Sequence, residues 1–143
     1  MNRWTKVLDS VAGGNPPPIP FVETLDLPGL DKWEPGKIWQ RWTVREDLFH
    51  PRGALFGGYI AALADRALGL VTMTVLENDE AFTTADLNVS FFRAVSSGVL
   101  RIEGEVIHRG RSLIQTECVF LREDGKLAAK ASASQAVIPF VEG

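Results

Sequence analysis

An apolar run over residues 56–76, FGGYIAALADRALGLVTMTVL, constrains the fold of this chain more than any other stretch. It is long enough for about five helical turns at roughly 3.6 residues each. Its residues are apolar on nearly every side, which is typical of a helix enclosed by other structure. Asp65 and Arg66 at its centre argue against a membrane span, because mid-span charges are costly in lipid. We therefore expect a buried core helix and no membrane partner.

Asp65 is the residue of this run that needs a special explanation. It lies several turns from either end of the helix, so neither N-capping nor the helix dipole accounts for it. Acidic side chains are rarely buried unless they are paired. Asp65 therefore either has a dedicated role inside the protein or lies with Arg66 on a narrow exposed stripe, and the apolar surroundings favour the first interpretation.

Composition excludes several classes of protein. The chain has 143 residues, 45% of them hydrophobic, and a net charge of −3, which predicts one domain with a real core and no electrostatic footprint for nucleic acid. The single cysteine, Cys118, cannot form an internal disulfide and is expected to be a buried thiol. Two histidines 58 residues apart make no zinc spacing, so neither a metal nor a cofactor is expected. The first residues lack a secretory signal pattern, which predicts a cytoplasmic protein.

Helical spacing and proline organise the N-terminal part of the single domain, residues 1–143. Trp4, Val7, Leu8 and Val11 recur at helical spacing before two glycines, which predicts a short amphipathic helix. The proline-rich segment that follows must be extended, because proline fixes its own φ and biases the residue before it. Residues 1–20 are therefore expected to wrap a core of residues 21–139. Residues 21–27 are expected to form a turn of helix that runs into a strand.

Alternating or strand-like runs supply the rest of the core. The predicted strands are residues 37–46, before the long helix, and residues 81–93, 99–109, 112–122 and 126–139, after it. Short turns containing glycine separate the last four. In the last strand Leu127, Ala129, Ala131 and Ala133 share one face, which would let another layer come close. The expected class is α+β, with a meander of antiparallel strands curled round the long helix.

Two consecutive glycines, Gly57 and Gly58, open the helix at the end of the loop DLFHPRGALFGG. Glycine is unfavourable in a helix, but the first N–H groups of a helix are unpaired and carry the positive end of its dipole. The pair therefore indicates either a ligand that approaches the backbone or simply a tight turn from loop to helix.

The order of these elements, with GGxxxxLAD at residues 57–65 and TTADLNVSFFR at residues 83–93, resembles hotdog-fold acyl-CoA thioesterases of the phenylacetic-acid-degradation (PaaI-type) subfamily. The resemblance covers residues 21–139. It implies a hotdog fold, thioester hydrolysis and an acyl-CoA substrate.

The resemblance also implies roles for individual residues. Asp65 would act as general base or nucleophile, the Gly57 N–H would polarise the carbonyl, and Thr84 would help to orient the acid or the water. The chain departs from the family where Phe56 replaces a histidine and where His50 replaces an asparagine. His50 could take the place of that asparagine at the site or could be an ordinary loop histidine.

Spacing along the helix predicts a shared site. Gly57 and Asp65 are eight residues apart, about 12 Å at roughly 1.5 Å per residue, which is too far for one carbonyl. They can act together only if two helices lie antiparallel across a two-fold axis. The active unit is therefore expected to be a homodimer, and the resemblance implies further pairing into a homotetramer.

Other residues have weaker assignments. Phe56 and Gly58 are expected beside the substrate, and Arg93 and the segment Arg109-Gly110-Arg111 near the phosphates of CoA. The acyl group would contact some of a set that could equally be ordinary core: Tyr59, Ile60, Leu63, Phe82 and Phe91. Two alternatives remain for the function: a non-catalytic acyl-CoA-binding or scaffold protein, and a dehydratase or isomerase that pairs His50 with Asp65.

Overall fold

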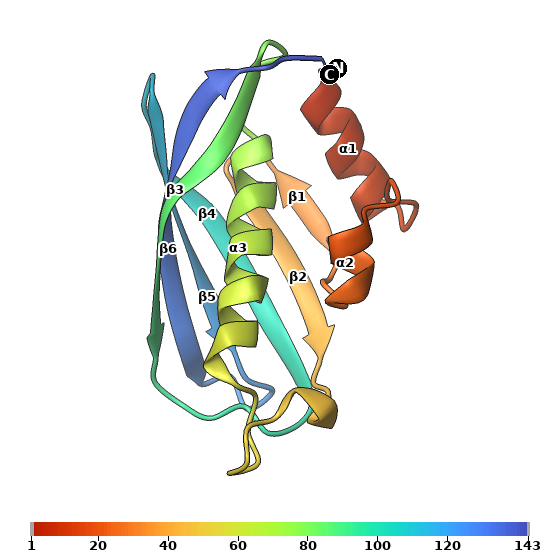
Figure 1. Cartoon of the computed structure of the whole chain (residues 1–143), viewed down its shortest axis with the longest axis vertical. Helices are drawn as coiled ribbons and strands as arrows, with labels where there is room; N and C mark the ends of the chain where they lie inside the picture. Colours follow the sequence, from red (N-terminus) through yellow and green to blue (C-terminus); the bar gives the residue numbers. More distant parts are fainter. Residues whose placement is uncertain (1, 143) are drawn as a thin grey trace.

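The long helix α3 (Gly57–Met73) lies in the hollow of a curved, six-stranded antiparallel sheet (Figure 1). This computed structural model describes residues 2–142. The helix is shorter than predicted at both ends, since Phe56 is its N-cap and Thr74 its C-cap. A sheet wrapped around one central helix is the hotdog fold, so the predicted α+β class is confirmed.

The sheet has the strand order β1-β2-β4-β5-β6-β3. Its strands are β1 (Lys32–Glu34), β2 (Lys37–Thr43), β3 (Glu80–Phe91), β4 (Val99–Arg109), β5 (Leu113–Leu121) and β6 (Leu127–Pro139). The predicted meander holds for β4, β5 and β6, which pair in sequence order. It is wrong for β3, which precedes β4 in the chain but pairs with β6 and forms the opposite edge of the sheet.

Two expectations for the first strands are also corrected. The strand predicted for residues 37–46 ends at Thr43, and a short 3-10 helix, η1 (Glu46–Leu48), follows. Strand β1 was not predicted, because three residues are too few to show an alternating pattern. Within β2 the alternation is confirmed, since Ile38, Gln40 and Trp42 are all buried.

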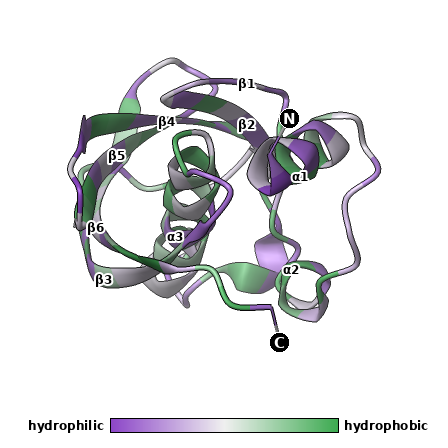
Figure 2. Ribbon diagram, turned by 90° about the horizontal axis from the view of Figure 1, so that it is seen from above, coloured by the Kyte–Doolittle hydropathy of each residue, from purple (hydrophilic) through white to green (hydrophobic). Residues whose placement is uncertain are grey.

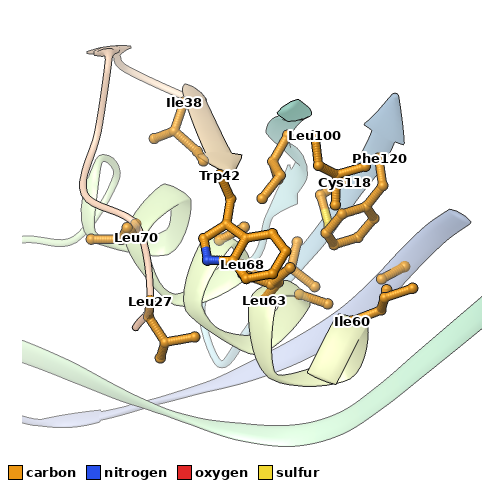
Figure 3. Close-up of a cluster of buried hydrophobic side chains, with 14 of the residues drawn as sticks. Leu27, Ile38, Trp42, Ile60, Leu63, Leu68, Leu70, Leu100, Cys118 and Phe120 are labelled. Atoms are coloured by element: carbon orange, nitrogen blue, oxygen red, sulfur yellow. The ribbon is translucent and has the colours of Figure 1, made fainter. Parts of the chain in front are cut away.

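The core is the contact between α3 and the concave face of the sheet (Figure 3). Leu63 and Leu68 of the helix are fully buried, as is Phe120 of β5, and Cys118 is a buried thiol as predicted. Small residues let the two layers approach, as expected for the last strand, where Ala129, Ala131 and Ala133 are buried. The remaining helix residues of the buried face are Tyr59, Ile60, Ala64, Ala67, Leu70, Val71 and Thr72.

One stripe of α3 is not covered, contrary to the expectation of a helix enclosed on nearly every side. Its residues recur every three or four positions and are exposed or half-buried: Gly58, Ala61, Ala62, Asp65, Arg66, Gly69 and Met73. Asp65 and Arg66 lie at the middle of this stripe. The stripe is apolar apart from these two residues, so the sequence pattern could not distinguish it from buried surface.

The N-terminal segment packs on the side of α3 that faces away from the sheet (Figure 2). Helix α1 (Arg3–Ala12) is capped by Asn2, whose side chain accepts a hydrogen bond from the Thr5 N–H, and it buries Leu8 and Val11. Helix α2 (Pro20–Thr24) follows the proline-rich segment, and the strand expected directly after it is absent from the described residues. None of the helices in residues 2–142 is long and apolar enough to cross a membrane.

Strand β3 contains a bulge that changes which of its residues face the helix. The register with β6 shifts between Thr84 and Asp86, leaving Ala85 as an extra residue. Directly opposed residues share a face of an antiparallel sheet. On the helix side lie Phe82 and Thr84 before the bulge and Leu87, Val89 and Phe91 after it, opposite the inward-facing residues Val137, Gln135, Ala133, Ala131 and Ala129.

The close approach of β6 to α3 generates a stability prediction. Ala131→Leu should lower the free energy of unfolding by about 1–3 kcal/mol, because extra methylenes forced into a packed core displace their neighbours. Ser132→Leu, the same residue introduced on the exposed face of the same strand, is the matched control and should change stability by less than about 0.5 kcal/mol. Urea unfolding of both variants measures the difference. Equal stabilities would show that the alanines do not set the spacing of the two layers.

Candidate functional site

The loop before α3 holds the first turn of the helix in place. The Leu55 N–H donates to the Val95 carbonyl and the Phe56 N–H to the Leu48 carbonyl. No side chain caps the helix, and the N–H groups of Gly57 and Gly58 donate to no partner within residues 2–142. Two backbone donors at the positive end of a helix dipole are therefore left for a group that approaches from outside.

Gly57 opens onto a groove of about 400 Å³, which we call the Gly57 groove. A Cβ atom at residue 57 would lie 3.1 Å from Cζ of Phe91, so the aromatic ring packs directly against the glycine backbone. A Cβ at Gly58 would lie 2.5 Å from the Phe56 ring. The groove is lined by His50, Arg52, Ala54, Leu55, Gly57, Ile60, Phe91, Phe92, Arg93, Ala94 and Val95.

His50 lies in this groove, half-buried, with one ring nitrogen already engaged. Its Nδ1 accepts a hydrogen bond of 3.1 Å from the Arg52 N–H. A neutral imidazole that accepts at Nδ1 carries its proton on Nε2. His50 therefore has the backbone contact expected of a loop histidine and retains one N–H donor beside Gly57.

Asp65 is exposed in the single chain and accepts a hydrogen bond from Thr84. The Thr84 hydroxyl donates to Oδ1 of Asp65 over 3.1 Å, and it can do so because the bulge turns Thr84 toward the helix. The structure therefore places Asp65 on the exposed stripe that one interpretation expected and also gives it a polar partner, while a dedicated role stays a prediction. The bond leaves the second carboxylate oxygen of Asp65 without a hydrogen bond from the described residues.

Asp65 and Thr84 line a second hollow, of about 220 Å³, which we call the Asp65 pocket. It lies between α3, the start of β3 and the short helix α2. Its lining residues are Phe21, Leu25, Leu27, Ala62, Asp65, Arg66, Gly69, Leu70, Met73, Phe82 and Thr84. His50 and Asp65 therefore line different hollows of one chain.

The three arginines proposed from the sequence do not lie together. Arg93 lines the Gly57 groove and donates to the Leu127 carbonyl at 2.8 Å. Arg109, at the β4–β5 hairpin, forms an ion pair with Glu80 at the start of β3 and donates to the Gly110 carbonyl. Because Glu80 follows the C-terminal end of α3, this hairpin lies at the other end of the helix from Gly57. Arg111 is exposed there.

Glu80 is ionised in the ion pair with Arg109. Burial opposes its negative charge, but the Glu77 N–H and the Arg109 guanidinium outweigh that effect and lower the pKa of the Glu80 carboxyl. Arg109 is therefore held by the protein itself before any ligand binds.

The apolar residues proposed to line an acyl pocket divide among three places. Phe82 lines the Asp65 pocket, Ile60 and Phe91 line the Gly57 groove, and Leu63 and Tyr59 belong to the core. Burial raises the pKa of Tyr59 to about 12, and its hydroxyl donates to the Leu25 carbonyl. Sequence reasoning missed that α2 and its C-cap residue line the Asp65 pocket, although Phe21 and Leu25 have the one-turn spacing of a helical pair.

Comparisons with known proteins agree on one family. The sequence model of the thioesterase superfamily matches residues 52–129, which include the end of the loop before α3, α3 itself and strands β3 to β5. The chain belongs to the thioesterase superfamily. The proofreading thioesterase EntH of Klebsiella pneumoniae is 30% identical over 105 residues, covering 73% of this chain and 77% of that protein.

Solved structures show the same fold. A phenylacetic acid degradation-related protein of Ralstonia eutropha superposes with a TM-score of 0.80 at 24% identity, covering 91% of this chain and 98% of that one. The protein smu.793 of Streptococcus mutans, bound to acetyl CoA, superposes with a TM-score of 0.71 at 22% identity, covering 78% of this chain and 88% of that one. Family membership makes this chain a hydrolase of the thioesterase type. Within residues 2–142, no group of three or more acidic, histidine or cysteine side chains could hold a metal ion.

The hydrogen bond between Thr84 and Asp65 predicts a measurable loss on its removal. Thr84→Val should lower kcat for thioester hydrolysis by about tenfold to a hundredfold, because a hydrogen bond to a charged group contributes about 1.5–3 kcal/mol. Thr84→Ser restores the hydroxyl and should recover most of that activity. The matched control is Thr83→Val, the same substitution at the preceding residue, which lies on the other face of β3. Equal activity of the two valine variants would remove Thr84 from the site.

Proposed function

We propose that this protein is an acyl-CoA thioesterase that hydrolyses its substrate to free acid and CoA. The observation that carries the proposal is the placement of Asp65, hydrogen-bonded to Thr84 at the rim of an apolar pocket, on the same helix as the unpaired N–H groups of Gly57 and Gly58. The acetyl CoA bound to the S. mutans structure supports CoA thioesters as the substrate class for this fold.

The chemistry requires a base or nucleophile and a donor for the developing oxyanion. As general base, Asp65 takes a proton from water while the water oxygen bonds to the thioester carbon. The carbonyl electrons then move to oxygen, where the Gly57 N–H stabilises them. Re-formation of the carbonyl breaks the C–S bond, and the proton on Asp65 passes to the leaving CoA thiolate. As nucleophile, Asp65 would instead form an anhydride that water hydrolyses.

One chain cannot perform these steps alone. Gly57 and Asp65 lie about 12 Å apart along α3, so a second copy must supply one of the two groups. The free edge of β3 offers the way to bring it, because within residues 2–142 β3 pairs only with β6 and leaves its other edge open. If β3 pairs with the β3 of a second copy across a two-fold axis, the N–H and C=O groups of this edge gain hydrogen-bond partners. The result is a homodimer with antiparallel helices.

The contacts within one chain determine the register of this β3–β3 pairing. Gly57 packs against Phe91 and Asp65 is bonded to Thr84. Gly57 therefore meets the partner subunit's Asp65 when Phe91 lies opposite the partner subunit's Thr84. Counted along the ladder with β6, which accounts for the bulge, the midpoint of Phe91 and Thr84 is Asn88. We place the two-fold axis at Asn88.

The same register would bring the other proposed site residues of the two subunits close to one another. His50, Gly57, Phe56, Gly58 and Arg93 of one protomer would face Asp65 and Thr84 of the other. The start of the partner's β3 then continues about 13 Å beyond its Thr84, at roughly 3.3 Å per residue. That distance carries the partner's hairpin, with Arg109, Gly110 and Arg111, toward the Arg93 end of the groove, where the CoA phosphates would bind. Pairing into a homotetramer and a cytoplasmic location stay predictions from the sequence.

The catalytic role of Asp65 is tested by removing its charge. Asp65→Asn is nearly isosteric and should lower kcat at least about a hundredfold, because it removes the base or nucleophile. Thermal unfolding should be little changed, since Asp65 is exposed in the single chain. The measurement is release of free thiol from a panel of short, medium, long-chain and aryl acyl-CoAs. Unchanged turnover on a good substrate would reject the assignment, and CoA binding without hydrolysis by the unmodified protein would favour the non-catalytic alternative.

The register is tested by a cysteine on the two-fold axis. Asn88→Cys should give a covalent dimer on mild oxidation or with a short thiol cross-linker, because directly opposed side chains have Cβ atoms about 4.5–5.5 Å apart. Asn88 is exposed on the outer face of the sheet, so the change should not disturb the site. The native Cys118 should not interfere, because burial raises the pKa of its thiol to about 12.

Ser90→Cys is the matched control for this experiment. Ser90 lies two residues from the axis on the same face, so its two copies would be about 13 Å apart at roughly 3.3 Å per residue. It should form no disulfide under the same conditions, as judged by non-reducing electrophoresis. Cross-linking of Ser90→Cys but not Asn88→Cys would reject the proposed register, and a lack of either in a protein that sediments as a dimer would reject β3 as the interface.

A further inference from the structure

A second cavity lies directly behind the Asp65 pocket. It has a volume of about 190 Å³ and lies beneath the proline-rich segment, so we call it the proline cavity. The two hollows share four lining residues, which therefore form the wall between them: Leu27, Arg66, Leu70 and Met73. Three of the four are apolar and the fourth, Arg66, is charged.

The Asp65 pocket has the chemistry of a site for an apolar tail. Apart from Asp65, Thr84 and Arg66, its lining side chains are aliphatic, aromatic or absent, as at Gly69. A dry cavity of about 150 Å³ is large enough for benzene, and this pocket has about 220 Å³. Phe21 and Leu25 of α2, which are 56% and 42% exposed, cover its outer side and would gain burial when an apolar ligand fills it.

The length of the pocket sets the length of the tail. Its lining on α3 runs from Ala62 to Met73, and the part beyond Asp65, where the carbonyl would lie, spans eight residues or about 12 Å at roughly 1.5 Å per residue. A zigzag of carbon–carbon bonds of about 1.5 Å spans that distance with roughly eight to ten carbons. Gly69 lies midway, where a Cβ atom would be 3.5 Å from the ring of Phe82, in ordinary contact. Any larger side chain there would extend into the space of the tail.

Arg66 is the charged residue in the wall between the Asp65 pocket and the proline cavity. Its Nε donates to the Pro28 carbonyl at 3.3 Å, which ties the side chain to the segment after α2. No carboxylate within the described residues forms an ion pair with it, and burial lowers the pKa of its guanidinium. An apolar chain that reached past this residue would have to displace a charged group from its anchor.

We infer that the Asp65 pocket selects medium-length acyl groups of about eight carbons or the equivalent aromatic size, with Gly69 providing the space along the helix and Arg66 closing the wall through which a longer chain would enter the proline cavity. This inference rests on the proposed thioesterase function, because it places the tail of the acyl group whose carbonyl would react beside Asp65. The segment that precedes the family match, residues 1–51, thereby contributes specificity through α2 and the proline cavity.

The depth of the pocket is tested at Gly69. We expect kcat/KM of the unmodified enzyme to rise from butanoyl-CoA to octanoyl-CoA and to fall at least tenfold at hexadecanoyl-CoA. Gly69→Leu should lower the octanoyl to butanoyl ratio of kcat/KM at least tenfold, since each methylene that loses its site is worth roughly fourfold. Gly69→Ala should give a smaller change in the same direction. Its Tm should not fall, because alanine favours a helix over glycine.

The upper limit is tested at Arg66. Arg66→Ala joins the two cavities and should raise the hexadecanoyl to octanoyl ratio of kcat/KM at least tenfold. Arg101→Ala, which removes an exposed arginine on the outer face of β4, is the matched control and should leave both ratios unchanged. Equal ratios in Arg66→Ala and the control would reject the role of Arg66.

The outcomes separate this inference from the proposed function. Hydrolysis of several acyl-CoAs with a chain-length profile that Gly69→Leu does not alter would overturn the inference and leave the function standing. If no acyl-CoA is hydrolysed, the proposed function fails, and calorimetric binding of octanoyl-CoA and butanoyl-CoA then decides the inference. If folded Gly69→Leu has a lower ratio of octanoyl-CoA to butanoyl-CoA affinity than the unmodified protein, the inferred role of the Asp65 pocket is supported. An unchanged ratio rejects it.

Discussion

The approach of one helix to the inner face of a curved sheet is the contact on which the rest of this structure depends. Buried alanines on β6 let α3 lie deep in the hollow, and Gly104 of β4 faces the same helix, since a Cβ at residue 104 would lie 3.7 Å from Cβ of Val71. Because the sheet covers only part of the helix circumference, one stripe of α3 stays exposed or half-buried. The charged side chains of the helix lie on that stripe and its unpaired N–H groups lie at its start, so the packing that stabilises the core also exposes the candidate site.

The position of β3 explains why the site residues are divided. This strand follows α3 directly in the chain yet forms the far edge of the sheet, so it lies beside the open stripe and is itself unpaired on one side. Phe91 near one end of the strand touches Gly57, and Thr84 toward the other end touches Asp65. A single edge strand thereby contacts both halves of the proposed site, and the proposed mechanism requires this strand to pair with its copy in a second subunit.

Much of the fold could be predicted from the sequence because its signals are local. Helical spacing identified α1 and α3, and alternation bounded by turns identified β2 and the four later strands to within a few residues. Neither the pairing of β3 with β6 nor the three-residue β1 has a local signal, so both were found only in the structure. The contact of Thr84 with Asp65 was expected through a family resemblance. The contribution of Phe21, Leu25 and Arg66 to the pocket depends on how α2 folds back, which no spacing in the sequence reveals.

The bulge at Ala85 has a consequence for how this strand can change in evolution. Successive side chains of a strand point to opposite faces of the sheet. The extra residue reverses that alternation once, between Thr84 and Asp86. Because of this reversal, Thr84 before the bulge and the apolar side chains after it all face the helix. Substitutions at individual positions can tune either half independently. A change of chain length by one residue would turn the Thr84 hydroxyl or the apolar edge outward, so this short segment should tolerate replacement far better than insertion or deletion.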